Sequence, residues 1–205
     1  MLLKQLSDND KRIFLRLAEL VSLCDRPMLW NGKPREEATT ADFKADAISL
    51  KWDKQVFEAM KELASALIGD ANFKTVGMPK PVADKTAAAW LGLHQTSVSE
   101  ELIRRLEAKP LTAGGDSAVR VTVATDILRE ILKDHKAATP SLPKLMLFEL
   151  FLLSLASGSI SSVQWQVLSE FKHHHQLEDY IVEDLLARAQ STHIEAQKTI
   201  AIILE

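Results

Sequence analysis

An apolar run between residues 145 and 160, LMLFELFLLSLASGSI, constrains the fold of this chain more than any other feature. Glu149 is the only charged residue in it, and Gly158 marks its end. A helix that crosses a bilayer needs about 20 consecutive apolar residues, so this run is too short to span a membrane. The run therefore predicts a helix in the core of a globular protein.

Helical periodicity recurs in the first third of the chain. Ser7 is a typical helix cap, and the apolar residues after it recur at helical spacing as far as Cys24. Residues 26–40 contain two prolines and show no periodicity, which predicts a long loop. Residues 42–70 are expected to be helical throughout, with Asp53 as the cap of a second helix.

Three more helices are predicted after the apolar run. Ser161 and Gln164 have the spacing of a capping box and begin the first of these helices. Thr192 and Glu195 have the same spacing, which predicts a separate last helix whose apolar end packs against the rest of the chain. Together these patterns predict an all-α helical bundle.

The middle of the chain, residues 77–139, differs from its flanks. The segment AAAWLGLHQTSVSEELIRRLE, residues 87–107, resembles a helix-turn-helix. The next segment, PLTAGGDSAVRVTV, residues 110–123, stands where a wing would be. Within it, residues 111–123 predict a small hairpin that turns at a Gly-Gly pair. Residues 125–135 then predict another helix.

A winged helix-turn-helix at residues 83–123 implies a second helix that can enter the major groove of DNA. The basic residues expected to contact phosphates are Arg104, Arg105, Lys109 and Arg120. However, residues 80–135 contain eight basic and eight acidic residues, so this segment lacks the excess of positive charge typical of a DNA-binding surface. Protein interaction is therefore favoured over DNA binding, and an ordinary helical hairpin is a further alternative.

The composition excludes several kinds of site. The chain has 205 residues, of which 25 are basic and 28 acidic, and this balance argues against nucleic-acid binding along its whole length. With a single cysteine, Cys24, it has neither an internal disulfide nor a cysteine-based zinc site. The apolar residues around Cys24 predict a buried side chain rather than a nucleophile. No signal peptide is visible, so a cytoplasmic protein is expected.

Three consecutive histidines, residues 173–175, raise the question of a metal site. Consecutive residues of a helix point about 100° apart, so the three side chains cannot converge on one ion. Histidines at the end of a helix suit the negative end of its dipole. They are therefore interpreted as a solvated helix end, and so are the isolated His94, His135 and His193.

Acidic residues gather near the C-terminus. Between Trp165 and Glu205 there are seven acidic and three basic residues. A solvated face is the default interpretation, and a docking face for a basic protein partner is the functional alternative. The residues predicted to bind such a partner are Glu178, Asp179, Glu183 and Asp184.

Part of this pattern resembles a known family. In LLSLASGSISSVQWQVLSEFKHHHQLEDYIVEDLLARA, an apolar helix ends in a small-residue turn, an Ile-Ser step follows, and two further helices come after it. This order is similar to that of the tellurite-resistance TerB-like family, and residues 8–70 show a weaker version of it. The resemblance implies a TerB-like bundle formed by residues 1–76 and 140–205, with residues 77–139 as an insert. It also implies a role in bacterial stress or phage resistance.

The resemblance also suggests a metal site, because acidic turn residues of the family are proposed to bind metal. In the first copy of the turn the acid is kept at Asp25, with Glu36 and Glu37 across the loop as further candidate ligands. In the second copy the acids are replaced by Ser157 and Ser159, whose neutral hydroxyls are poor ligands for a hard cation. A metal-sensing role at Asp25 is thus one alternative.

No arrangement of residues in the sequence suggests catalysis, so no enzymatic activity and no cofactor apart from that metal ion are expected. The sequence predicts a protein that acts by binding a protein partner. The alternatives are a DNA-binding regulator through residues 83–123 and a metal sensor at Asp25.

Overall fold

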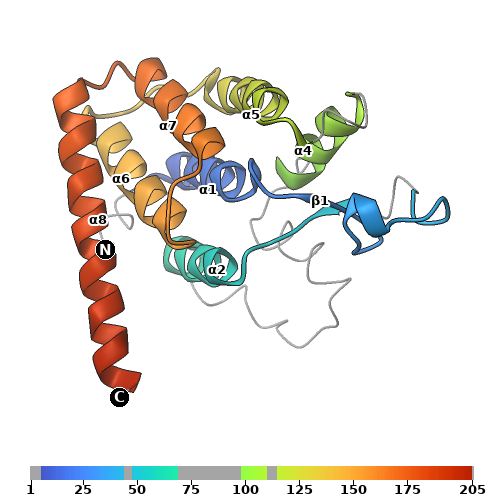
Figure 1. Ribbon diagram of the computed structural model, residues 1–205. Coiled ribbons are helices and arrows are strands. Elements are labelled where there is room, and N and C mark those ends of the chain that lie inside the picture. The colour runs from blue at the N-terminus through green and yellow to red at the C-terminus, as the bar shows by residue number, and fades with distance from the viewer. Residues whose placement is uncertain (1–5, 44–47, 69–97, 110–114, 205) are drawn as a thin grey trace.

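The computed structural model describes residues 6–43, 48–68, 98–109 and 115–204. These residues form mostly helices, with one short two-stranded ribbon (Figure 1). In chain order the elements are α1 (Asp8–Leu23), β1 (Met28–Trp30), η2 (Arg35–Glu37), β2 (Ile48–Leu50), α2 (Lys54–Ile68), α4 (Val98–Glu107), α5 (Ser117–Leu132), α6 (Ser141–Leu155), α7 (Ser162–His174) and α8 (Asp179–Leu204). The prediction of an all-α helical bundle is confirmed.

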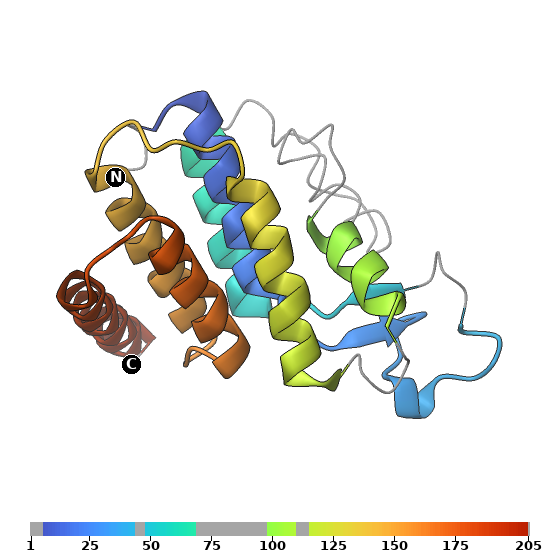
Figure 2. The same cartoon turned by 90° about the horizontal axis from the view of Figure 1, so that it is seen from above.

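Helix α1 forms the centre of the bundle. It contacts α2, α4, α5, α6 and α7, and Figure 2 shows it between α2 and α5. Phe14, Leu17 and Leu20 on α1 are completely buried. The apolar run predicted as a core helix is α6, in which Met146 and Leu147 are also completely buried, so that prediction is confirmed.

The capping predictions at two helix starts are confirmed. Asp53 accepts hydrogen bonds from the backbone N–H groups of Gln55 and Val56 at the start of α2. Ser161 and Gln164 form the reciprocal capping box of α7. Gln164 is also completely buried and donates from Nε2 to the Val21 carbonyl on α1, at 3.0 Å, so one side chain both begins α7 and ties it to the central helix.

The ribbon near residues 28–50 corrects two predictions. Strands β1 and β2 pair antiparallel, with Met28 opposite Leu50, so residues 42–70 are not helical throughout and residues 26–40 are not all loop. Between the strands, the Asp42 carboxylate accepts hydrogen bonds from Asn31, Lys33 and Thr39, which hold its pKa well below the usual value. A single buried acid thus organises a turn that has no hydrophobic periodicity.

The hairpin predicted at residues 111–123 is wrong over its described part, residues 115–123. Residues 117–123 begin α5, and the Asp116 side chain caps this helix by accepting from the Ala118 N–H group at 2.8 Å. The β-branched residues of the run favour a strand only weakly. Here Val123, Ile127 and the residues a turn further on lie on one helical face that packs on α1 and α7, and this burial outweighs the propensity.

The helix-turn-helix prediction lies partly outside the described residues, which begin again at Val98. Its second helix is present as α4. Both α4 and α5 pack on α1. The division of the chain at residues 77 and 139 stays a prediction.

The last two predicted helices are one. Helix α8 runs without interruption for 26 residues, so Thr192 and Glu195 lie inside a helix and do not begin one. Its C-terminal end is exposed and does not pack against the bundle as expected. Among the described helices, none is long and apolar enough to cross a membrane.

Candidate functional site

One stripe of α8 has the spacing of a helix-packing seam. From Val182 to Ile203 its positions alternate steps of four and three residues, as the a and d positions of a heptad do, and Leu204 lies four residues after Ile200. All of them lie within about 60° of one line along the helix at 100° per residue. We call this stripe the α8 seam, and its residues are Val182, Leu186, Ala189, His193, Ala196, Ile200, Ile203 and Leu204. Val182 and Ala189 are buried, and α8 packs along α6 over this part.

Helix α6 covers only the first half of the seam. Both helices start at the same end of the bundle, because Lys144 on α6 and Ile181 on α8 line one pocket. At 1.5 Å per residue, the 15 residues of α6 extend about 22 Å and the 26 residues of α8 about 39 Å. Helix α6 therefore ends near the level of His193, and Figure 1 shows α8, in red, continuing well past it.

The remaining part of the seam is apolar and uncovered. We call Ala196, Ile200, Ile203 and Leu204 the open seam. Ile200, Ile203 and Leu204 are 49%, 74% and 80% exposed. Most single exposed apolar residues need no explanation, but a contiguous apolar group on one face is typical of an interaction surface.

The charges of this part of α8 lie away from the seam. Glu195 and Lys198 pair with each other at 2.8 Å, at the outer positions of the heptad. The positions beside the seam are Gln197 and Thr199, which are uncharged. The open seam is therefore neutral as well as apolar, so it has no charge with which to attract an acidic or a basic partner.

The four acidic residues predicted to bind a partner lie at the opposite end of α8. Asp179 forms an ion pair with Lys172 on α7, and Asp184 pairs with Arg188 at 2.9 Å. Glu178 and Glu183 are exposed. Two of the four carboxylates are thus engaged within the chain, and their role in binding a basic partner stays a prediction.

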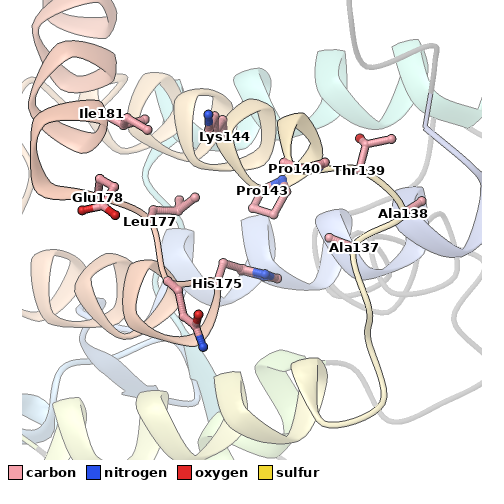
Figure 3. Close-up of a pocket in the computed structure, with 11 residues that line it drawn as sticks. Ala137, Ala138, Thr139, Pro140, Pro143, Lys144, His175, Leu177, Glu178 and Ile181 are labelled. Atoms are coloured by element: carbon pink, nitrogen blue, oxygen red, sulfur yellow. The ribbon is translucent and has the colours of Figure 1, made fainter.

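A pocket of about 400 Å³ opens where the α5–α6 and α7–α8 linkers meet (Figure 3). Its lining mixes apolar and polar side chains, with Lys144, His175 and Glu178 as the ionisable residues. In Figure 3 the His175 imidazole extends toward Ala137 and Pro143. Burial, together with the neighbouring His174 and His135, lowers the pKa of His175 to about 4, so this imidazole is neutral at physiological pH.

The prediction of a wholly solvated histidine end is therefore only partly right. His173 and His174 are exposed, but His175 is half-buried and packs on Phe171, with ring centroids 4.5 Å apart. Its ring also lies 6.0 Å from that of His135.

His135 is likewise not a solvated residue. It is buried, and its Nε2 lies 2.9 Å from the Asp10 carboxylate on α1. Burial by itself raises the pKa of Asp10, but hydrogen bonds from Ser7 and His135 outweigh burial and leave it below its usual value. An ionised Asp10 accepts a hydrogen bond from the Nε2–H group of His135. This pair holds the α5–α6 linker against the start of α1.

The structure does not gather the predicted metal ligands. Glu36 and Glu37 are exposed on η2, whereas Asp25 follows α1 and lies 3.4 Å from its neighbour Arg26. Within residues 6–43, 48–68, 98–109 and 115–204, no three His, Cys, Asp or Glu side chains are close enough together to hold a metal ion. The structure therefore does not bring Asp25, Glu36 and Glu37 together, and metal binding at Asp25 stays a prediction.

The cysteine beside this turn is inaccessible. Cys24 is buried, as predicted, and burial raises the pKa of its thiol far above the usual value. A protonated, buried thiol is a poor nucleophile.

The four basic residues predicted to bind DNA do not form one stripe. Arg120 is buried and donates from Nη1 to the carbonyls of Cys24 and Arg26, at 3.3 and 2.7 Å. Arg104 and Arg105 both pair with Glu101, and Arg105 also pairs with Glu130 at 2.6 Å. Arg104 and Lys109 are exposed, and Lys109 lies in the turn that follows α4. The expected phosphate contacts are thus largely taken up by bonds within the chain.

The open seam was missed because the capping-box motif at residues 192–195 hid the continuity of α8. The heptad spacing from Val182 to Ile203 is visible in the sequence and would have revealed the open seam.

Comparison of the chain with protein-family models, with curated proteins and with solved structures gave no match. The TerB-like resemblance therefore stays a prediction.

Proposed function

We propose that this protein is a non-enzymatic helical interaction module that binds another macromolecule through the open seam of α8. The observation that carries the proposal is the exposure of Ile200, Ile203 and Leu204 on the same stripe that packs on α6 earlier in the helix, where Ala189 is buried. The bacterial stress or phage-resistance setting implied by the TerB-like resemblance is part of this proposal and gives it a biological context.

The physical reason lies in how the seam is divided. Its first half is covered by α6, as helix packing requires of an apolar stripe. Its second half has the same spacing and greater apolar bulk, yet no described residue covers it. Burying such side chains stabilises a complex by roughly 25 cal/mol per Å² of apolar surface before the costs of association. A partner that packs on the open seam is therefore held by apolar contacts of the same kind as those between α6 and α8.

Two adjacent residues provide a matched test. Ile203 is 74% exposed and lies on the seam, whereas Ile202 is 72% exposed and points to the opposite side of the helix. A photo-reactive benzoylphenylalanine replaces Ile203 in one variant and Ile202 in another, and both variants are irradiated in the native host. We expect a discrete crosslinked adduct at position 203 and much less at position 202. Equal yields at both positions, or no adduct at either, would contradict the proposal.

A further inference from the structure

We infer that the partner of the open seam is a second copy of this chain, paired with the first as an antiparallel, two-fold symmetric dimer of α8 tails. This inference rests on the proposed function and names its partner. In such a dimer the same surface is used by both subunits, so the surface must be complementary to itself.

The charge distribution favours a second copy. The open seam and its flanking positions Gln197 and Thr199 carry no charge, and Glu195 and Lys198 neutralise each other on the outer face. Two such surfaces meet without repulsion, whereas a charged partner would gain nothing from the contact and would have its own charges desolvated. The surface that best matches a neutral apolar stripe is another neutral apolar stripe.

The end of α6 fixes the direction of pairing. Paired helices lie about 8–10 Å apart. In a parallel pair the two α6 helices, which cover the same stripe of each α8, would collide near His193. In an antiparallel pair the two bundles lie at opposite ends, and each tail extends along the partner's seam as far as the end of α6.

The position at which α6 ends also fixes the register of the antiparallel pair. If the pair is centred near Lys198, Leu204 of each subunit reaches the end of α6 on the other, and the two open seams overlap between Ala196 and Ile200. Each Ile200 then faces Ala196 of the partner subunit, and each Ile203 faces His193 of the partner subunit. Ile200 opposite Ala196 sets a large side chain against a small one, an arrangement that packs closely without voids or overlap.

The interface is small. The overlap involves about three turns of helix per subunit, which places it among weak, reversible associations rather than permanent ones. The dimer should therefore dissociate on dilution. Its dissociation constant should respond strongly to a single charge placed on the seam, since that charge would be buried without a partner.

Sedimentation velocity of the full chain over a wide range of concentration tests the inference. We expect a reversible monomer–dimer equilibrium for the wild-type protein. The double substitution Ile200→Asp and Ile203→Asp should raise the dissociation constant at least about tenfold, because it buries charges in the interface. The matched control, Ile194→Asp with Ile202→Asp, places the same charges at exposed positions off the seam. It should change the dissociation constant by much less.

A second variant separates packing from charge. Ala196→Phe keeps the seam apolar but fills the space that Ile200 of the partner subunit needs, so it should also weaken the dimer. Wild-type protein that remains monomeric at every concentration overturns the inference, and so does an equal effect of the seam and control substitutions. If the protein is monomeric but position 203 still crosslinks to another macromolecule in the host, the second-copy inference fails and the proposed function stands.

Discussion

Replacing Arg120 with methionine is expected to lower the free energy of unfolding by about 2 to 3 kcal/mol. The guanidinium of Arg120 donates to the carbonyls of Cys24 and Arg26, where α1 ends, and Arg120 is itself buried on α5. Methionine retains an apolar stem of similar length but leaves these carbonyls without their donor. Unsatisfied polar groups that are shielded from water are costly. Chemical denaturation of the purified variant measures the change.

Arg129 provides the control, since it lies on the same helix. Its side chain is 59% exposed, and it pairs with Glu170 and Asp126 at the surface. Exposed ion pairs contribute about 0–1 kcal/mol, so Arg129→Met should have a small effect. Equal losses from the two substitutions would show that Arg120 does not have the structural role described here.

Acidification is expected to destabilise the protein through His175. Its imidazole is neutral in the folded state, with a pKa lowered to about 4, and its ordinary value is 6.5. Because the unfolded chain binds the proton more readily, the stabilising contribution of a neutral His175 is complete above pH 6.5. It declines below that pH and is lost below about 4. The expected loss over this window is at most about 3 kcal/mol.

The His175→Phe substitution removes this titration and keeps an aromatic ring against Phe171. Urea unfolding at several pH values should therefore show a shallower decline for His175→Phe than for the wild type. His173→Phe is the matched control, because His173 is exposed and should leave the decline unchanged. Asp10, whose pKa is lowered, adds a loss of its own at still lower pH in all three proteins. Parallel pH profiles for the three proteins would contradict the role assigned to His175.

Local sequence signals predicted the features that depend on local chemistry. The apolar run of α6, the capping box of α7 and the burial of Cys24 each follow from a few neighbouring residues. A run too short for a membrane and too apolar for a surface can only be buried. These predictions therefore did not depend on the rest of the fold.

Where packing decided between two local tendencies, the sequence pattern was misleading. The run VRVTV favours a strand by propensity, but on α5 its Arg120 and Val123 are buried on the helical face that packs on α1 and α7. Thr192 and Glu195 match a capping motif, but α8 continues through them. A cap stabilises a helix start only where the chain leaves the helix, and the motif alone does not establish that.

Contacts between distant segments were beyond the reach of sequence patterns. Asp10 and His135 are 125 residues apart in the chain, and Arg120 and Arg26 are 94 apart. No spacing rule connects such pairs, so His135 was interpreted as solvated and Arg120 as a surface residue. Only the three-dimensional packing shows that both are buried and bonded to the ends of α1.

Hydrogen–deuterium exchange along α8 tests most directly whether the open seam is an interaction surface. The backbone amides of residues 196–204 are followed in the purified chain at low and high protein concentration, and again in an extract of the native host. An uncovered helix end opens readily, and a partner slows its exchange. We predict that exchange at residues 196–204 slows at high concentration or in the extract, while exchange in α4 does not change. Equally fast exchange of the tail under all these conditions would contradict the account.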